Sequence, residues 1–244
     1  MFENPDYIVV GSGSAGSTIA YRLGENPSNQ VLVLEFGGSD FSPFIQMPAA
    51  LSYPMNMPKF DWGYKAEPEP ELNGRSLVCP RGKVIGGSSS INGMIYVRGN
   101  PGDYHEWARS GATGWDYPDV LPYFQRMEQS HGGTSEFRGS DGPLHVTHGK
   151  RDNPLHEAFV NAAQQAGYER TEDYNAYRQE GFGPADMTVH NGSRFSTAKA
   201  YLKPALAKKN VKLVTRVLVD KIIFEGKKAV GVEFFYQGQK KTIK

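Results

Sequence analysis

The chain has 244 residues and a formal net charge of +1, which favours one or two globular domains and gives no strong field for nucleic acid. No apolar run approaches the roughly 18 residues of a membrane-spanning helix. Cys79 is the only cysteine, so no internal disulfide can form. The first expected strand begins at Tyr7, too early for a signal peptide before it, and we expect a cytoplasmic protein. Peripheral contact of the protein with the inner face of the cytoplasmic membrane is an alternative.

The first motif is a glycine-rich turn between an expected buried strand, Tyr7–Val10, and an expected helix, Ser14–Arg22. Gly11 allows a tight turn, Gly13 lets the backbone approach a pyrophosphate, and Gly16 lets helix and strand pack closely. The helix N-terminus then offers free N–H groups to phosphate. The motif consists of Gly11, Ser12, Gly13, Ser14, Ala15 and Gly16.

A second expected strand, Val31–Leu34, ends at Glu35, about twenty residues after the turn. A carboxylate at this position can accept hydrogen bonds from the hydroxyls of an adenosine ribose, and it disfavours a ribose 2′-phosphate. The order of strand, turn, helix, strand and acid therefore predicts a site for an adenine dinucleotide. It does not distinguish NAD from FAD.

The second motif lies within Arg81–His105, where Gly86-Gly87-Ser88-Ser89-Ser90 precedes Ile91–Tyr96. A flexible Ser/Gly loop is the simplest interpretation of such a composition. A second small-residue cradle is, however, what a flavin requires, because its ribityl chain and ring extend beyond the first phosphate site. The two motifs together favour FAD.

The run Gly82–Asn92, continuing through Tyr96, Gly99 and His105, resembles the first signature of the glucose–methanol–choline (GMC) oxidoreductases. Similarity to this family continues along the chain. It includes Trp62-Gly63-Tyr64, Asn73-Gly74-Arg75, Asp141-Gly142-Pro143-Leu144 and Ser196–Leu202.

The resemblance implies an α/β chain with a Rossmann-like FAD-binding fold and a parallel sheet, plus part of an α+β substrate domain. Residues 1–244 would be the N-terminal FAD-binding region, and 141–205 would contribute to a substrate-facing layer. Gly11–Gly16 would hold the pyrophosphate and Glu35 the ribose. The remaining cofactor-binding residues implied are Val84, Gly86, Gly87, Ser88, Asn92, Gly93, Met94, Ile95 and, at the adenine, Val219.

The same resemblance implies oxidation of a choline-like primary alcohol, with oxygen or a respiratory quinone as electron acceptor. Other aliphatic or aromatic alcohols, or a flavin-binding module without catalysis, remain alternatives. Asn92 stands where some members carry the histidine that attaches the flavin covalently, so we expect non-covalent FAD. No catalytic residue is assigned, because the family's catalytic histidine is expected beyond Lys244 in a longer enzyme.

The chain has six histidines, and His145-x-x-His148 is the pair closest to a metal-binding pattern. Residues i and i+3 of a strand face opposite ways, so these two should not share an ion, and no metal site is expected.

Between the motifs, Phe36–Pro70 is expected to be a long ordered excursion, followed by a hairpin turn at Asn73-Gly74. Helical spacing predicts a core-packed helix over Pro118–Met127 and an amphipathic helix marked by Leu155, Phe159, Ala162 and Ala166. A surface loop is expected at 132–142. Further predicted elements are a strand at Leu144–Thr147, a helix Thr197–Lys208 capped by Ser196, and strands Val211–Thr215, Val217–Phe224, Ala229–Tyr236 and Lys240–Ile243.

Overall fold

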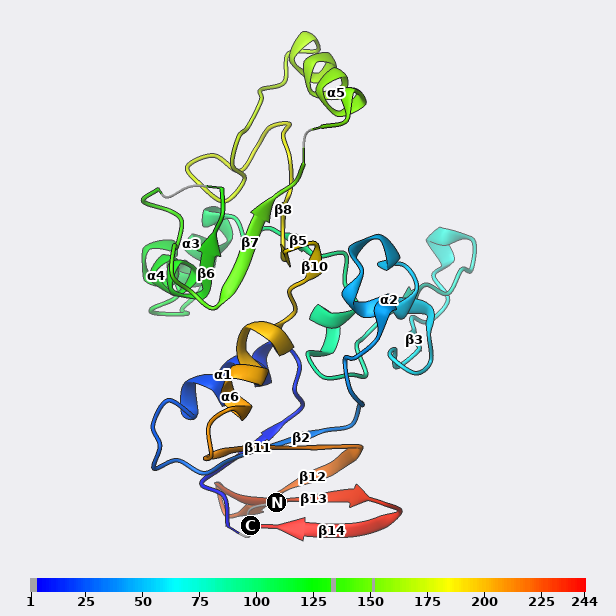
Figure 1. Ribbon diagram of the computed structural model, residues 1–244, viewed down its shortest axis with the longest axis vertical. Helices are drawn as coiled ribbons and strands as arrows, with labels where there is room; N and C mark the ends of the chain where they lie inside the picture. The colour runs from blue at the N-terminus through cyan, green and yellow to red at the C-terminus, as the bar shows by residue number, and fades with distance from the viewer. Residues whose placement is uncertain (1–3, 133–134, 151) are drawn as a thin grey trace. The chain divides into compact units, whose positions relative to one another are not determined.

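The computed structural model describes residues 4–132, 135–150 and 152–244. The chain forms two compact units, which Figure 1 shows in chain colours. The first unit consists of Met1–Gly93 and Gly192–Lys244, and the second of Met94–Asn191. Within the described residues, no helix is long and apolar enough to cross a membrane.

A parallel sheet lies at the centre of the first unit. Strand β2 (Val31–Glu35) pairs with β1 (Tyr7–Val10) on one side and β11 (Val211–Thr215) on the other. All five residues of β2 are buried, as a continuous apolar run predicts for a strand covered on both faces. Helices α1 (Ser14–Leu23) and α6 (Lys203–Leu206) lie on one face of this sheet (Figure 1).

The opposite face packs against an antiparallel sheet of β12 (Val217–Glu225), β13 (Lys228–Tyr236) and β14 (Gln239–Ile243). The three predicted strands of this sheet are confirmed. The core on this side is apolar and contains Leu32, Leu34, Val217, Val232, Phe234 and Ile243. The predicted α/β class with a parallel sheet is therefore confirmed.

The excursion after β2 is ordered, as expected. It holds the short helix α2 (Pro43–Gln46), 3₁₀ turns at Pro48–Ala50 and Pro54–Asn56, and the hairpin of β3 (Tyr64–Lys65) and β4 (Val78–Cys79). Asn73 and Gly74 have φ values of 56° and 70° and lie between the antiparallel strands β3 and β4, so the predicted hairpin turn is confirmed. Between these strands lies the 3₁₀ turn Pro70–Leu72, and after them the second motif forms a 3₁₀ turn at Gly87–Ser90.

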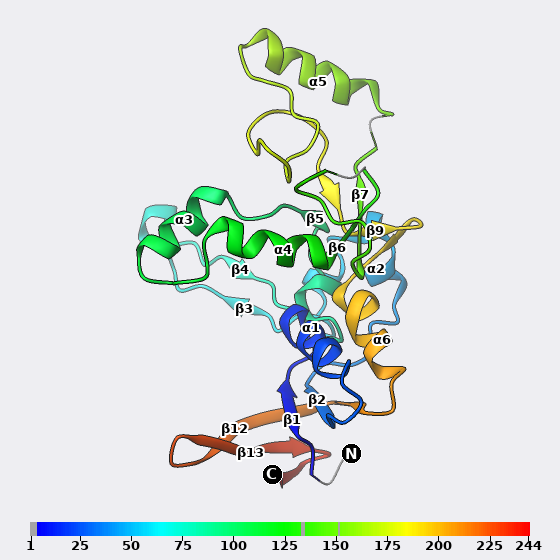
Figure 2. The same cartoon turned by 90° about the vertical axis from the view of Figure 1, so that its left-hand side faces the viewer.

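The second unit contains a four-stranded sheet in the order β5 (Ile95–Tyr96), β8 (Asp186–Met187), β7 (Leu144–His148) and β6 (Glu128–Ser130). Helices α3 (Pro101–Arg109) and α4 (Tyr117–Met127) pack against each other (Figure 2). Helix α5 (Pro154–Gln165) and strand β9 (Val189–His190) complete this unit. The surface loop predicted at 132–142 has no strand or helix among its described residues, and 133 and 134 lie outside them.

One predicted helix face was wrong, and another was right but is less buried than expected. In α5 the buried residues are Val160 and Ala163, whereas Leu155 is 75% exposed and Phe159 is 63% exposed. In α4 the expected core residues are only half-buried, and no residue of the helix is fully buried. Periodicity identified both helices, but the face that packs depends on neighbours from distant parts of the chain.

The predicted cap at Ser196 was also wrong. The helix begins as a π-helical turn, Ala198–Leu202, before α6, and the Ser196 hydroxyl makes no capping hydrogen bond. The backbone carbonyl of Ser196 instead accepts from the N–H groups of Lys199 and Ala200. This turn follows the short strand β10 (Ser193–Arg194) in the first unit. The range 141–205 does not coincide with the second unit, and its role towards substrate stays a prediction.

Candidate cofactor site

The two glycine-rich turns meet in the first unit. The Gly86 N–H donates to the Ser12 carbonyl at 2.9 Å. Gly87 has a φ of 55°, and a Cβ on this residue would lie 2.7 Å from the Cα of Gly13. Only glycine permits this approach. Segments that are far apart in the sequence therefore form one continuous cradle of backbone.

Glu35 lies at the end of β2 directly beside this cradle and is 6% exposed. Its Oε2 accepts from the N–H and the hydroxyl of Ser12 at 2.7 and 2.9 Å, and its Oε1 accepts from the N–H of Gly37 at 2.6 Å. Each carboxylate oxygen has two acceptor positions, so Oε1 retains one for a ligand. The structure thus orients the acid with its own backbone and leaves room for a ribose hydroxyl.

A cleft of about 300 Å³ opens over these residues. Val219, predicted to meet the adenine, lines it together with Glu35 and both turns. Its full lining consists of Val10, Gly11, Gly13, Leu34, Glu35, Phe36, Trp62, Gly82, Gly87, Val217, Leu218 and Val219. An apolar wall, an oriented carboxylate and exposed backbone at a helix N-terminus fit an adenine dinucleotide.

Two other predicted residues, Val84 and Ser88, stabilise the second turn of the cradle through their contacts with the protein. Val84 is fully buried among Ile45, Phe60 and Ile91. The Ser88 hydroxyl accepts from the Gly82 N–H at 3.1 Å. Both contacts hold the second turn in place, and a direct contact of either residue with a flavin remains a prediction.

Met94 and Ile95 belong to the second unit, whereas Gly93 ends the preceding segment of the first. Met94 is buried with a φ of 64°, and its carbonyl accepts from the Thr188 N–H at 2.8 Å. Ile95 is 55% exposed on β5. The predicted contacts of these two residues with the ribityl chain stay predictions.

Sequence reasoning missed Arg194, which is 1% exposed and supports the loop that contains Asn92. Its Nη1 donates to the carbonyl and the Oδ1 of Asn92 at 2.7 and 2.9 Å, and its Nε donates to the Ile45 carbonyl at 2.8 Å. Burial lowers the pKa of Arg194 to about 10. None of the ion pairs formed among the described residues includes it. A single arginine in a polar stretch carries no periodic signal, so only the fold reveals this role.

The second unit holds a buried ion network made of Arg98, Glu128, Arg138 and Asp186. The two Glu128 oxygens contact Arg98 Nη2 at 3.0 Å and Arg138 Nε at 2.7 Å, and Arg138 Nη1 lies 2.8 Å from Asp186. Burial, and then the charge of Glu128, raise the pKa of the neighbouring Tyr96 well above its usual value.

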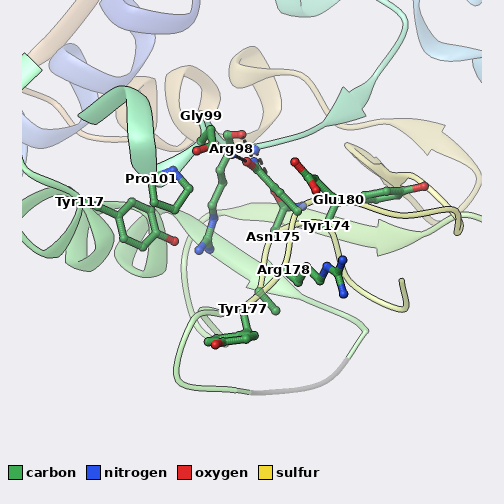
Figure 3. A pocket seen from close by; sticks show the side chains of 12 residues that line it. Arg98, Gly99, Pro101, Tyr117, Tyr174, Asn175, Tyr177, Arg178 and Glu180 are labelled. Atoms are coloured by element: carbon green, nitrogen blue, oxygen red, sulfur yellow. Dashed lines mark hydrogen bonds between the residues drawn. The ribbon is translucent and has the colours of Figure 1, made fainter. Parts of the chain in front are cut away.

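An open pocket of about 240 Å³ adjoins Arg98 in the same unit, and Tyr117, Tyr174 and Tyr177 lie around it (Figure 3). The Arg98 N–H donates to Asn175 Oδ1 at 2.8 Å, and the Arg98 carbonyl accepts from Gln179 Nε2 at 2.5 Å. None of the predicted cofactor residues lines this pocket.

The two histidines of the His145-x-x-His148 pair have different neighbours. His148 Nδ1 lies 2.6 Å from Asp186, at the edge of the buried ion network. His145 instead contacts His131 and His190.

The fold and the cradle define a Rossmann-like dinucleotide-binding region. A family model described as GMC oxidoreductase matches residues 5–244. The chain therefore belongs to the GMC oxidoreductase family, and its cofactor is FAD.

Among curated proteins, the chain is 62% identical over 228 residues to an oxygen-dependent choline dehydrogenase of Brucella anthropi, covering 93% of this chain and 41% of that protein. It is 58% identical over 239 residues to the protein of the same name from Rhizobium etli, covering 98% of this chain and 43% of that protein. The chain thus spans less than half the length of these relatives.

Among solved structures, the chain is similar to pyridoxine 4-oxidase from Mesorbium loti, with a TM-score of 0.93 and 33% identity over 98% of this chain and 48% of that one. An FAD-dependent oxidoreductase from Chaetomium thermophilum has a TM-score of 0.89 and 29% identity, covering 98% of this chain and 44% of that one.

Proposed function

We propose that the protein carrying this chain oxidises a choline-like primary alcohol to the aldehyde, and that this chain supplies the cofactor site. The observation that carries the proposal is the junction of the two glycine-rich turns beside Glu35. Bound FAD supplies a two-electron acceptor for hydride. The role of this chain is to bind and orient: backbone at Gly13 and Gly87 admits the pyrophosphate, and Glu35 accepts from the ribose.

Choline is favoured as the substrate because relatives at 58–62% identity are named choline dehydrogenases. Aliphatic or aromatic alcohols are the second candidate, since a structural neighbour at 33% identity is a pyridoxine 4-oxidase. A flavin-binding module without catalysis is the third. Oxygen is favoured as the electron acceptor because these relatives are named oxygen-dependent, and a membrane quinone at the inner face of the cytoplasmic membrane is the alternative.

A substrate screen on the intact protein tests this proposal. The purified protein should be yellow and should turn over choline faster than benzyl alcohol or butanol with an artificial electron acceptor. Oxygen consumption measured without the dye then separates an oxidase from a dehydrogenase. Yellow protein that reduces the dye with none of these alcohols would refute the proposed activity, and colourless protein would refute the cofactor site as well.

We also propose that the flavin is held non-covalently. The side chain at position 92 is an amide, and its Oδ1 accepts from Arg194. An amide cannot form the histidyl linkage found in some members of the family. Acid precipitation should release all flavin into the supernatant, and yellow protein in the pellet would contradict this.

A further inference from the structure

Three histidines from separate strands of the second unit lie together. His131 directly follows β6, His145 is in β7, and His190 ends β9. The His131 N–H donates to the Val146 carbonyl at 2.8 Å, which fixes the end of β6 beside β7. The Thr147 hydroxyl donates to the Val189 carbonyl at 2.9 Å, which fixes β9 on the other side. The backbone thus holds the three imidazoles in one place.

The ring nitrogens converge. One nitrogen from each of the three rings lies within 4.8 Å of the other two. His131 Nε2 is 2.7 Å from His145 Nδ1, and the centroids of the His145 and His190 rings are 3.9 Å apart. His131 is exposed and the other two are half-buried, so a small ion can reach the cluster from solvent.

These separations suit a d-block cation. Zinc binds imidazole nitrogen at about 2.0–2.1 Å, so two nitrogens in a tetrahedral site lie about 3.3 Å apart. One observed separation, 2.7 Å between His131 Nε2 and His145 Nδ1, is shorter than that value, and all the nitrogens lie within 4.8 Å of one another. Side-chain rotation at this accessible cluster would bring the three nitrogens to the spacing that the ion requires.

We propose that His131, His145 and His190 bind one divalent d-block ion, such as Zn²⁺, with the fourth position open to water. The site lies in the second unit, and every ligand comes from a strand end or a strand. An ion there would join β6, β7 and β9 and so stabilise that unit. His148 is not in the ligand set, because among the described residues the converging nitrogens belong to His131, His145 and His190. The sequence pattern did not show this cluster, because its members come from three separate segments.

Titration of the intact, FAD-loaded protein with Co²⁺ tests the site, because tetrahedral Co²⁺ has visible absorption bands distinct in intensity from those of the aqueous ion. A Co²⁺-minus-apo difference spectrum removes the flavin background. One equivalent per chain is expected to bind, and Zn²⁺ should displace it. His145→Gln should abolish the bands, and His131→Gln and His190→Gln should each weaken binding at least tenfold. Bound Zn²⁺ should also raise the thermal midpoint of the wild type.

The matched control is His156→Gln, which replaces a histidine on α5 in the same unit and should leave Co²⁺ binding unchanged. Flavin absorbance and circular dichroism report whether each variant is folded, and the exposed His131 provides a variant that should fold even if His145→Gln does not. Absence of saturable Co²⁺ binding by the wild type would overturn the proposal. Equal binding by folded His131→Gln, His190→Gln and wild type would also overturn it.

Discussion

The two units use polar side chains in opposite ways. In the first unit the interior is apolar on both faces of the parallel sheet, and Glu35 and the glycine turns gather at a cleft. In the second unit the interior contains charged groups, with Glu128 fully buried and Arg98 and Arg138 nearly so. Strands β5 and β8 in that unit have two residues each, so they offer little apolar surface. Charge pairing there holds the structure together. In the first unit Glu35 faces the cleft, and the buried Arg194 is held by carbonyl and amide oxygens instead of an ion pair among the described residues.

The largest effect should come from breaking the buried ion network. Glu128→Ala leaves Arg98 and Arg138 buried without this partner, and removal of one member of a buried pair costs about 3–5 kcal/mol. In native-state hydrogen exchange of the intact protein, the amides of β7 should therefore exchange faster in Glu128→Ala than in the wild type. The control is Glu106→Ala, which breaks an exposed pair with Arg109 and should cost at most about 1 kcal/mol. Equal protection in both variants would show that the network contributes little.

The second effect concerns alkaline stability of the first unit. Burial raises the pKa of Tyr201 to about 12, from an unfolded value of about 10. The folded state therefore retains the proton longer than the unfolded state, and this contribution is present below pH 10 and is lost as pH rises towards 12. The loss should approach about 2–3 kcal/mol, at about 1.4 kcal/mol per pKa unit.

Urea unfolding measured from pH 9 to 12 tests this expectation, and Tyr201→Phe should flatten the decline because it removes the titrating group. Tyr96 in the second unit offers a comparison, because burial and then the charge of Glu128 raise its pKa. An unchanged slope in Tyr201→Phe would mean that the phenol of Tyr201 does not titrate on unfolding in this range.

A smaller effect separates ligand binding from folding. A Cβ on Gly13 would meet only the Cα of Gly87, at 3.9 Å, so Gly13→Ala should leave the stability of the apoprotein within about 0.5 kcal/mol of wild type. The same methyl group would obstruct the pyrophosphate and weaken FAD binding at least tenfold, about 1.4 kcal/mol. Fluorescence titration of apoprotein with FAD measures the affinity.

Gly16→Ala is the contrasting variant, because its Cβ would lie 2.0 Å from the Gly11 carbonyl oxygen and should destabilise the fold itself. If Gly13→Ala binds FAD with wild-type affinity, the first glycine-rich turn is not part of the cofactor site.

The smallest effect should lie at the surface of the second unit. Asp116 and Asp119 form a capping box at the start of α4, and Asp116→Ala should cost about 0.5–2 kcal/mol. Because α4 is only half-buried, hydrogen exchange should increase in its first turn while β7 stays protected. Increased exchange in β7 as well would show that the helix and the ion network unfold together.

The sequence predicted the elements whose information is local. The buried run Val31–Glu35, the turn at Asn73-Gly74 and the strands after Val211 were recognisable because period and turn chemistry act over a few residues. Both halves of the cofactor cradle were predicted for the same reason. Features that depend on distant partners were not: Arg194 reaches Ile45 and Asn92, and Glu128 pairs with Arg98 and Arg138. The wrong face of α5 has the same origin, since its packing partner is not encoded within the helix.

The contact between Gly87 and Gly13 also bears on how the protein is made. During synthesis the first glycine turn emerges well before the second, and β11, which completes the parallel sheet beside β2, emerges later still. Domains generally fold as units once their chain is available, so a nascent chain holding only the first turn has no finished cradle to offer. Cofactor capture should therefore follow the emergence of β11 and should not guide the first folding steps.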